Sequence, residues 1–326
     1  MEGRHIEDAN YGDGAILVFL PGWDDISRLK DSLAFSTRFR NQNKYRVLPL
    51  HSGVAPKEQQ LVFKRPPAGV RKIILSTNIA ETSVTIDDVV FVIDSGKMKE
   101  KSFDPHINLA TLMVQWVSQA SARQRKGRAG RVQPGVCFHL YSNQRTKSLL
   151  PYQKPELLRT PLEELSLQVQ LLGAQVVRAS GGDTGGDPRR AGFIASFLAK
   201  APEPPHTLAV ESAISLLKDI GALTANDEQL TDLGLCLANL PIDPRAGKMV
   251  LLSRMFGCLH YATLIAAGIG YRDPFVLPLN EQAKKQAKAS KAHFAAGFPS
   301  DQVSIDGGAR VLVPVLLLVP HVSAVI

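Results

Sequence analysis

The residues best suited to chemistry lie in one basic stretch, residues 124–131, which reads Gln-Arg-Lys-Gly-Arg-Ala-Gly-Arg. The preceding residues 121–123 favour a helix, in which Gln124, Arg128 and Arg131 would share one face. Two arginines on such a face can bind phosphate oxygens and neutralise the charge that develops during phosphoryl transfer. The alternative is a solvated basic helix or a plain nucleic-acid-binding patch, which composition alone favours.

Two glycines interrupt this stretch, at Gly127 and Gly130. Each costs about 1 kcal/mol relative to alanine if it lies inside a helix, so their presence needs a reason. The usual reason is that another surface approaches the backbone closely, and we expect such an approach here.

The overall composition is that of an ordinary folded protein with a basic surface. The 326 residues are 44% hydrophobic and 21% charged, which suggests two or three domains. The net charge of +8 favours a polyanionic partner such as nucleic acid or a nucleotide. Aromatic residues make up only 6%, so recognition of a nucleic-acid backbone is the better expectation than extensive base stacking.

Cysteine usage and the chain ends bear on compartment. The three cysteines are scattered and form no Cys-x-x-Cys pair, which argues for a reducing, intracellular compartment (cytoplasm or nucleus) and against a zinc site or another metal site in this chain. No secretory signal opens the chain. The apolar residues 309–326 contain Pro314 and Pro320, so we expect no membrane span but a partly buried segment or a foreign tail.

The first half of the chain alternates apolar strands with helices, which predicts an α/β fold with a parallel, doubly wound sheet. Ligands of such sheets bind at the carboxyl ends of the strands. Polar residues 51–53 and 76–78 lie just there. The expected strands are residues 15–20, 45–50, 71–75, 89–93 and 136–141, and the expected helices are one capped by Asp24, one over 56–63 and one over the basic stretch.

The second half reads as helical. Helices are expected from Pro161, over 207–220 with Gly221 as the terminator, over 230–240, and from Pro244 to about Gly270 as one stretch. A glycine-rich insertion over residues 180–188 is expected to be a loop, and residues 283–292 are either a polar helix or a loop.

Several stretches, taken together, resemble one protein family. Residues 124–131 resemble motif VI of superfamily 2 helicases; residues 17–23, 50–53 and 76–86 resemble motifs IV, IVa and V of the DEAH/RHA subgroup, in the same order. The resemblance covers roughly residues 14–275. It implies a second RecA-like domain over residues 1–155, a winged-helix domain over 156–243 with an insertion near 180–190, and a partial ratchet domain over 244–326.

The same resemblance assigns roles at a nucleotide. Arg128 and Arg131 would be arginine fingers, and Gln124 would position the γ-phosphate or the attacking water. Phe63 would stack on the base and Asp88 would approach the ribose. From the residues alone, Phe63 could equally be a core aromatic and Asp88 an exposed turn carboxylate.

Three further residues, Ser52, Thr77 and Asn78, would contact the backbone of single-stranded RNA by the same resemblance. Thr77 and Asn78 lie where a strand gives way to a helix, so side-chain and backbone donors can meet a phosphate there. Helix capping is the ordinary role of such residues and is compatible with that one.

Residues 97–114 have room for a hairpin, and the family places a strand-separating hairpin there. Lys97, Lys99 and Lys101 alternate, so they would share one strand face toward phosphates. The alternative is a solvated edge protected by lysines.

Two sequence patterns needed for phosphoryl transfer are not found: Gly-x-x-x-x-Gly-Lys-Ser/Thr and Asp-Glu-Ala-His. The resemblance therefore implies an ATP-dependent RNA helicase whose first RecA-like lobe, with the ligands of Mg²⁺, lies in other polypeptide. We expect this chain alone to be inactive toward ATP, and a truncated or misread gene product would explain both ends. The alternatives are a non-catalytic RNA-binding fragment and a helicase that acts on DNA.

Overall fold

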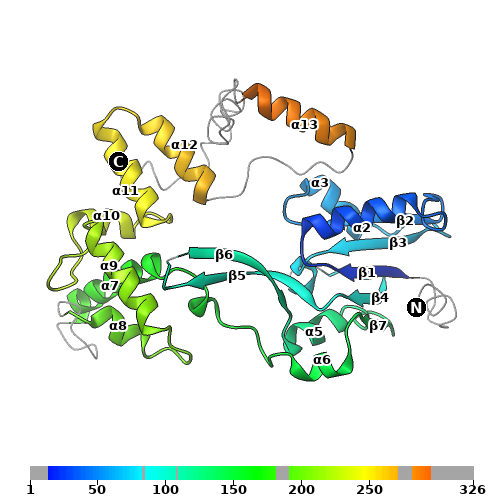
Figure 1. Ribbon diagram of the computed structural model, residues 1–326, viewed down its shortest axis with the longest axis horizontal. Helices are drawn as coiled ribbons and strands as arrows, with labels where there is room; N and C mark the ends of the chain where they lie inside the picture. The colour runs from blue at the N-terminus through cyan, green and yellow to red at the C-terminus, as the bar shows by residue number, and fades with distance from the viewer. Residues whose placement is uncertain (1–13, 83–84, 108, 181–190, 271–280, 295–326) are drawn as a thin grey trace. The chain divides into compact units, whose positions relative to one another are not determined.

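The computed structural model describes residues 14–82, 85–107, 109–180, 191–270 and 281–294 (Figure 1). The chain divides into two compact units. Among the described residues, the first unit contains those within 14–100 and 112–154 and residue 281, and the second contains those within 101–111, 155–270 and 282–294. Each unit has its own hydrophobic core and is taken separately below.

The first unit is built on a five-stranded sheet whose neighbours are all parallel. The strands are β1 (Ala15–Phe19), β2 (Tyr45–Leu50), β3 (Arg71–Ser76), β4 (Val89–Asp94) and β7 (Val136–His139). Their order, β2-β3-β1-β4-β7, can be followed from top to bottom in Figure 1. The predicted parallel, doubly wound sheet is confirmed.

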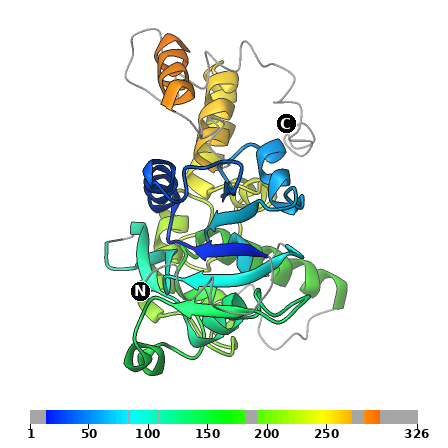
Figure 2. The same ribbon diagram turned by 90° about the vertical axis from the view of Figure 1, so that its right-hand side faces the viewer.

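Both faces of this sheet are covered, which explains why its strands read as continuous apolar runs. Helix α2 (Trp23–Phe35) covers one face, where Ile26 is fully buried. The other face packs against α3 (Pro56–Gln59), the 3₁₀ helix η1 (Gln60–Phe63) and α4 (Ile79–Thr82). Figure 2 shows α2 and α3 on opposite sides of the strands.

The expected cap of α2 is wrong. The helix begins at Trp23, one residue before Asp24, and its N-cap is Gly22, which offers no side-chain bond. Asp24 instead lies in the first turn beside Asp25. There a carboxylate still interacts favourably with the positive end of the helix dipole.

The basic stretch is only partly helical. Helix α5 (Gln119–Lys126) is capped by the Ser118 hydroxyl and ends at Gly127, so it includes Gln124 but neither Arg128 nor Arg131. The expectation of one shared helical face is therefore wrong. The chain leaves the helix in tight turns that bury Ala129 in the core, where a continued helix would carry this side chain elsewhere.

The expected close approach at the glycines is not found at Gly130, where a side-chain carbon would meet nothing within 4 Å. At Gly127 such a carbon would be 3.3 Å from the Arg123 carbonyl oxygen, which is tight. A close approach is found at Gly135 instead, before β7, where such a carbon would overlap the carbonyl oxygens of Ala129 and Val90.

A hairpin follows β4, as predicted. Its strands are β5 (Lys97–Asp104) and β6 (Leu109–Trp116). Met98 and Glu100 are buried on one face of β5, so Lys97, Lys99 and Lys101 share the other. The outer part of the hairpin, residues 101–111, belongs to the second unit, and Phe103 packs against that unit's core. Helix α6 (Asn143–Ser148) follows β7.

The second unit is helical. Its core is formed by α7 (Glu163–Ser180), α8 (Phe193–Leu198), α9 (Thr207–Asp219) and α10 (Asp232–Ala238), with a single antiparallel bridge between Leu223 and Leu230. Gly221 ends α9 with φ +77°, as expected. A short 3₁₀ helix, η2 (Glu156–Leu158), precedes α7, and most of the expected insertion lies outside the described residues.

The stretch expected as one helix from Pro244 is two helices, α11 (Pro244–Met255) and α12 (Leu259–Gly270). Gly257, with φ +67°, separates them, because this left-handed conformation cannot continue a helix. Helix α13 (Glu281–Phe294) decides the helix-or-loop alternative in favour of a helix. In the parts of the chain that are described, no helix is long and apolar enough to cross a membrane; the apolar tail lies outside them.

The close approach at Gly135 generates a prediction. The substitution Gly135→Ala places a methyl group against two backbone oxygens that cannot rotate away, so we expect it to destabilise the first unit by about 1–3 kcal/mol. Gly130→Ala, which meets open space, is the matched control. Urea unfolding followed by circular dichroism measures both, and equal stability of the two variants would contradict the packing described here.

Candidate functional site

The three predicted RNA-contacting residues follow adjacent strands of the sheet. Ser52 comes after β2, and Thr77 and Asn78 come between β3 and α4. Leu50 and Ser76, the last residues of β2 and β3, are paired, so the residues that follow them lie at the same carboxyl edge of the sheet. Ser52 and Asn78 are exposed, whereas Thr77 is only 9% exposed. The side chains available to a ligand at this edge are therefore those of Ser52 and Asn78.

His51 lies at the same carboxyl edge. Its Nδ1 accepts a hydrogen bond from the Gly53 N–H at 3.0 Å, and its ring lies 5.6 Å from that of Trp23. Burial, and then the nearby charge of Lys99, lower the pKa of His51. The imidazole is therefore neutral at pH 7, and Lys99 supplies the positive charge beside it.

The predicted nucleotide-contacting arginines lie elsewhere. Arg128 and Arg131 line a gap of about 10 Å³ together with residues of β1, α4, the turn before β4 and the start of β4 (Leu17, Ala80, Ile86 and Val89). This gap lies over one face of the sheet and toward the amino end of β4. Ligands of parallel sheets usually bind at the carboxyl ends of the strands. The predicted RNA-contacting residues lie at that edge, whereas Arg128 and Arg131 do not.

The positive charges of Arg128 and Arg131 act on each other. The Arg128 guanidinium donates a hydrogen bond to the backbone carbonyl of Glu81. Burial, and then the positive charge of Arg131, lower the pKa of Arg128, which nevertheless stays charged at neutral pH. Two like charges held together in this way favour binding of an anion, because an anion relieves their repulsion. Gln124 is exposed on α5.

Phe63 and Asp88 are connected by a lysine that sequence reasoning missed. The Lys72 ammonium, 1% exposed, donates to the carbonyl oxygens of Val62 (2.6 Å) and Lys64 (3.2 Å) and pairs with Asp88 Oδ1 at 2.9 Å. It thus fixes the backbone on both sides of Phe63. A lysine in β3, directly before the apolar residues 73–75, was the available signal.

These contacts settle two alternatives. Phe63 is 52% exposed, so it is not a core aromatic. Asp88 is only 16% exposed and ion-paired, so it is not a free turn carboxylate; the exposed carboxylate of this turn is Asp87.

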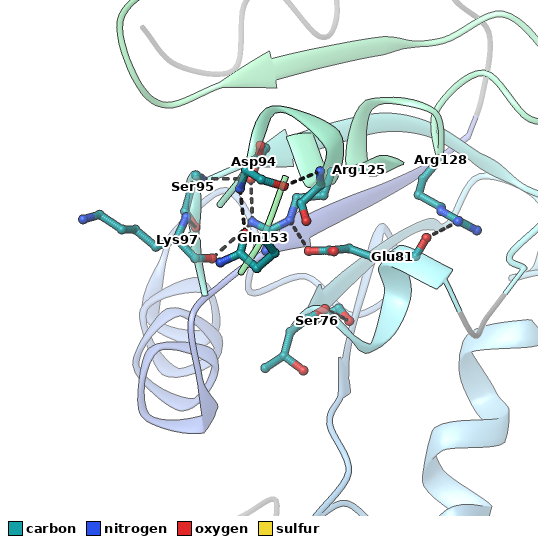
Figure 3. Close-up of polar contacts among 12 residues, drawn as sticks. Ser76, Glu81, Asp94, Ser95, Lys97, Arg125, Arg128 and Gln153 are labelled. Atoms are coloured by element: carbon teal, nitrogen blue, oxygen red, sulfur yellow. Dashed lines mark hydrogen bonds and ion pairs between the residues drawn. The ribbon is translucent and has the colours of Figure 1, made fainter. Parts of the chain in front are cut away.

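A second missed residue is Arg125, which is completely buried. Its Nε binds Glu81 Oε1 at 2.6 Å, and its Nη1 binds Asp94 Oδ1 at 2.7 Å and the Lys97 carbonyl oxygen at 3.1 Å. Its guanidinium also lies 4.8 Å from the centre of the Phe19 ring. Figure 3 shows Arg125 between Asp94 and Glu81.

Asp94, also fully buried, extends this network. Its second carboxylate oxygen is 3.2 Å from His139 Nδ1 and accepts a hydrogen bond from the Tyr141 hydroxyl at 3.0 Å. Burial is the main reason that the pKa of Tyr141 is raised, and the Asp94 charge adds to it. Burial likewise raises the pKa of Cys137 to about 12, so that this thiol is inert.

Glu81 joins the two candidate surfaces. Its side chain binds Arg125, its backbone carbonyl binds Arg128, and its helix α4 begins directly after Asn78 (Figure 3). Burial raises the pKa of Glu81 in spite of the opposing charge of Arg125. A single helical turn therefore connects the RNA candidates with the arginines predicted to contact the nucleotide.

Family comparisons agree with this architecture. A family model described as the helicase conserved C-terminal domain matches residues 4–133. Two further models match the winged-helix and ratchet-like parts of the helicase-associated domain, over residues 213–242 and 243–304. The fold and these three regions are those of helicase domains. The chain belongs to the DEAH/RHA family of helicases.

Individual relatives support the same assignment. The chain is 48% identical over 293 residues to the ATP-dependent DNA/RNA helicase DHX36 of Bos taurus, which covers 90% of this chain and 27% of that protein. It is also 48% identical to the DExH-box ATP-dependent RNA helicase DExH1 of Arabidopsis thaliana, over 90% of this chain and 28% of that protein. The chain thus spans about a quarter of the length of these curated relatives.

Among solved structures, the chain is similar to the Escherichia coli DEAH/RHA helicase HrpB. The two share a TM-score of 0.66 and 30% identity over 81% of this chain and 31% of that one.

The Arg125 network generates a prediction. Arg125→Met leaves the carboxylates of Glu81 and Asp94 buried without their common partner, so we expect a loss of about 3–5 kcal/mol of unfolding free energy at pH 7. Arg123→Met, on the exposed face of the same helix, is the control. Urea titrations of the purified chain measure both.

The loss of unfolding free energy in Arg125→Met should depend on pH. The folded-state pKa of Glu81 is already raised, and removing Arg125 raises it further. Protonation at low pH then stabilises the folded variant, and this stabilisation is lost as the pH rises through the folded pKa. The deficit of Arg125→Met relative to the unmodified chain should shrink from pH 7 to about pH 5, and a deficit that grew would contradict the burial of Glu81.

Proposed function

We propose that this chain supplies the arginine-finger lobe, a winged helix and part of the ratchet of an ATP-dependent RNA helicase. The observation that carries the proposal is the pair of guanidinium groups of Arg128 and Arg131, which line the same gap over the sheet. Such a pair on the surface of a RecA-like sheet is suited to the negative charge of a transferring phosphoryl group. The relatives that match this chain are named as ATP-dependent helicases.

In this proposal ATP binds between this lobe and a first RecA-like lobe, the chain's partner. Mg²⁺ would accompany the ATP, held by ligands of that first lobe, and would neutralise phosphate charge. Arg128 and Arg131 would bind the γ-phosphate, and Gln124 would orient the phosphate or the attacking water. The exposed ring of Phe63 would stack on the base, with Asp88 near the ribose.

Single-stranded RNA would bind at the carboxyl edge through Ser52, Thr77 and Asn78. The exposed Asn78 amide and Ser52 hydroxyl would bind phosphate oxygens, while Thr77 contributes mainly through its backbone. The proposed domains are residues 1–155 (RecA-like), 156–243 (winged helix) and 244–326 (partial ratchet), in an intracellular protein. The connection through Glu81 gives a physical route by which occupancy of one surface alters the other.

DNA is the second candidate substrate, because a relative at 48% identity is named as a DNA/RNA helicase. Contacts to phosphate alone do not distinguish the two, since only the 2′-hydroxyl differs at the backbone.

The binding experiment compares 12-nucleotide oligouridylate and oligodeoxythymidylate by fluorescence anisotropy. A hydrogen bond to a charged group contributes about 1.5–3 kcal/mol, so Asn78→Ala should weaken binding by roughly tenfold or more. Asn43→Ala, an exposed asparagine before β2 at the opposite edge, is the control and should have no effect. Equal affinity of both variants would remove Asn78 from the interface, and tighter binding of the deoxy strand would favour DNA.

The ATPase experiment has two parts. The 326-residue chain by itself should hydrolyse ATP no faster than background, with or without RNA. When the chain is joined to a lobe that bears a phosphate cradle, Arg128→Ala and Arg131→Ala should each lower kcat by about 10³-fold or more. Arg123→Ala should not. RNA-stimulated turnover by the 326-residue chain alone would show that it contains a phosphate cradle of its own.

A further inference from the structure

A cluster of cations and aromatic rings lies at the base of the β5–β6 hairpin and includes Lys97, one of its three alternating lysines. The Lys97 ammonium is 3.6 Å from the centre of the Trp116 ring, and the Arg145 guanidinium carbon is 4.8 Å from it. The Tyr141 ring meets the Trp116 ring edge to face, with centres 6.0 Å apart. All four residues belong to the first unit.

From this arrangement we infer a further phosphate-binding site, formed by Lys97 and Arg145 over Trp116, for the backbone of the single-stranded nucleic acid. The inference rests on the proposed function, because it extends the strand beyond Ser52 and Asn78.

The cluster concentrates positive charge. Within the described residues, neither Lys97 nor Arg145 forms an ion pair with a carboxylate. Burial, and then the charge of Arg145, lower the pKa of Lys97. One cation over the indole would suffice for packing, whereas a second costs like-charge repulsion. A phosphate between the two removes that repulsion.

The backbone of Lys97 is held in place by its neighbours. The Lys97 carbonyl oxygen accepts a hydrogen bond from buried Arg125 at 3.1 Å, and its N–H donates to the Ser95 hydroxyl at 3.3 Å. Gly96, with φ +70°, allows the Tyr141 and Trp116 rings to come so close that a side chain there would meet both. The cations are thus presented from a fixed backbone, which reduces the entropy lost on binding.

The cluster lies at the carboxyl edge of the sheet. Lys97 follows the carboxyl end of β4, and Tyr141 and Arg145 follow that of β7. In the sheet order these strands continue the row that begins with β2 and β3. With strands roughly 4.8 Å apart, β3 to β7 spans roughly 14 Å. That distance accommodates about four phosphates of a stacked single strand.

The two cations over its surface keep a base from stacking on Trp116, so the ring acts as their support rather than as a base platform. The site is therefore expected to read phosphate and not base identity. RNA and DNA of equal length should respond alike to its removal.

The test compares two double variants of the 326-residue chain. Lys97→Met with Arg145→Met removes the proposed site and keeps the apolar stems. Lys44→Met with Arg46→Met removes the same charges from the amino end of β2, the opposite edge, and is the matched control. Affinity for 12-nucleotide oligouridylate and oligodeoxythymidylate is measured against potassium chloride concentration.

The expected result is a change of slope. Each lost phosphate contact to a single strand reduces the slope of log K against log salt by about 0.7, so the first variant should lose about 1.4 with both probes and the control nothing. The single variant Arg145→Gln, at an exposed side chain, should lose about 0.7 even if the double variant folds poorly.

The outcomes separate this inference from the proposed function. If the unmodified chain binds neither probe, both fail. If it binds and Asn78→Ala weakens binding, but the Lys97 and Arg145 variants keep the original slope, only this inference fails. An equal loss of slope in the control variant also overturns this inference, because the effect would then come from net charge alone. A loss of slope confined to RNA overturns it as well, because it would indicate a contact to the 2′-hydroxyl.

Discussion

The first unit depends on one guanidinium group that is held entirely out of water. Arg125 is placed between two carboxylates, those of Glu81 and Asp94, which come from the helix after β3 and from the end of β4. A buried charge of this kind is tolerated only when its partners are fixed with good geometry. Its neighbours are therefore fixed as well: the Lys97 backbone at the hairpin base, the Phe19 ring beneath it, and through Asp94 the side chains of His139 and Tyr141.

This interior network separates two surfaces with different chemistry. At the carboxyl edge of the sheet, exposed amide and hydroxyl groups lie in a row with lysines near them. Over the sheet face, toward the amino end of β4, two arginines lie within reach of each other's charge. Because α4 contributes to both, a displacement of that single turn reaches each surface without passing through the rest of the unit. This division fits the proposed function, in which the lobe contacts a nucleotide on one surface and a nucleic acid on the other.

Sequence patterns predicted the sheet well and the chemistry of individual side chains less well. The five strands were readable because a parallel strand buried on both faces is a short apolar run bounded by turns. The boundaries of helices were harder: the left-handed Gly257 splits one periodic stretch in two, and Gly127 ends α5 before the arginines. Periodicity reveals neither the left-handed conformation of Gly257 nor the point at which α5 ends, since Gly127 itself has right-handed helical angles.

The sequence alone did not show which of several arginines is buried and which is exposed. Arg125, Arg128 and Arg131 are of one type within seven positions, yet the first is fully buried and the last is exposed. Only the carboxylates of Glu81 and Asp94, distant in sequence, decide which arginine is enclosed. The same holds for Trp116, whose cationic neighbours come from residues 19 and 29 positions away.

The number of hydrogen-bond acceptors around Lys72 explains why a lysine occupies this position. An ammonium carries three N–H donors, and the acceptors around this one are three: the oxygens of Val62, Lys64 and Asp88. Leucine would leave a carboxylate and two carbonyls desolvated without donors, and the planar fork of arginine does not match a target of that shape. Lysine is therefore the side chain whose donors match the three acceptors at this position. This match explains why a charged residue is buried in β3, where hydropathy alone would predict an apolar one.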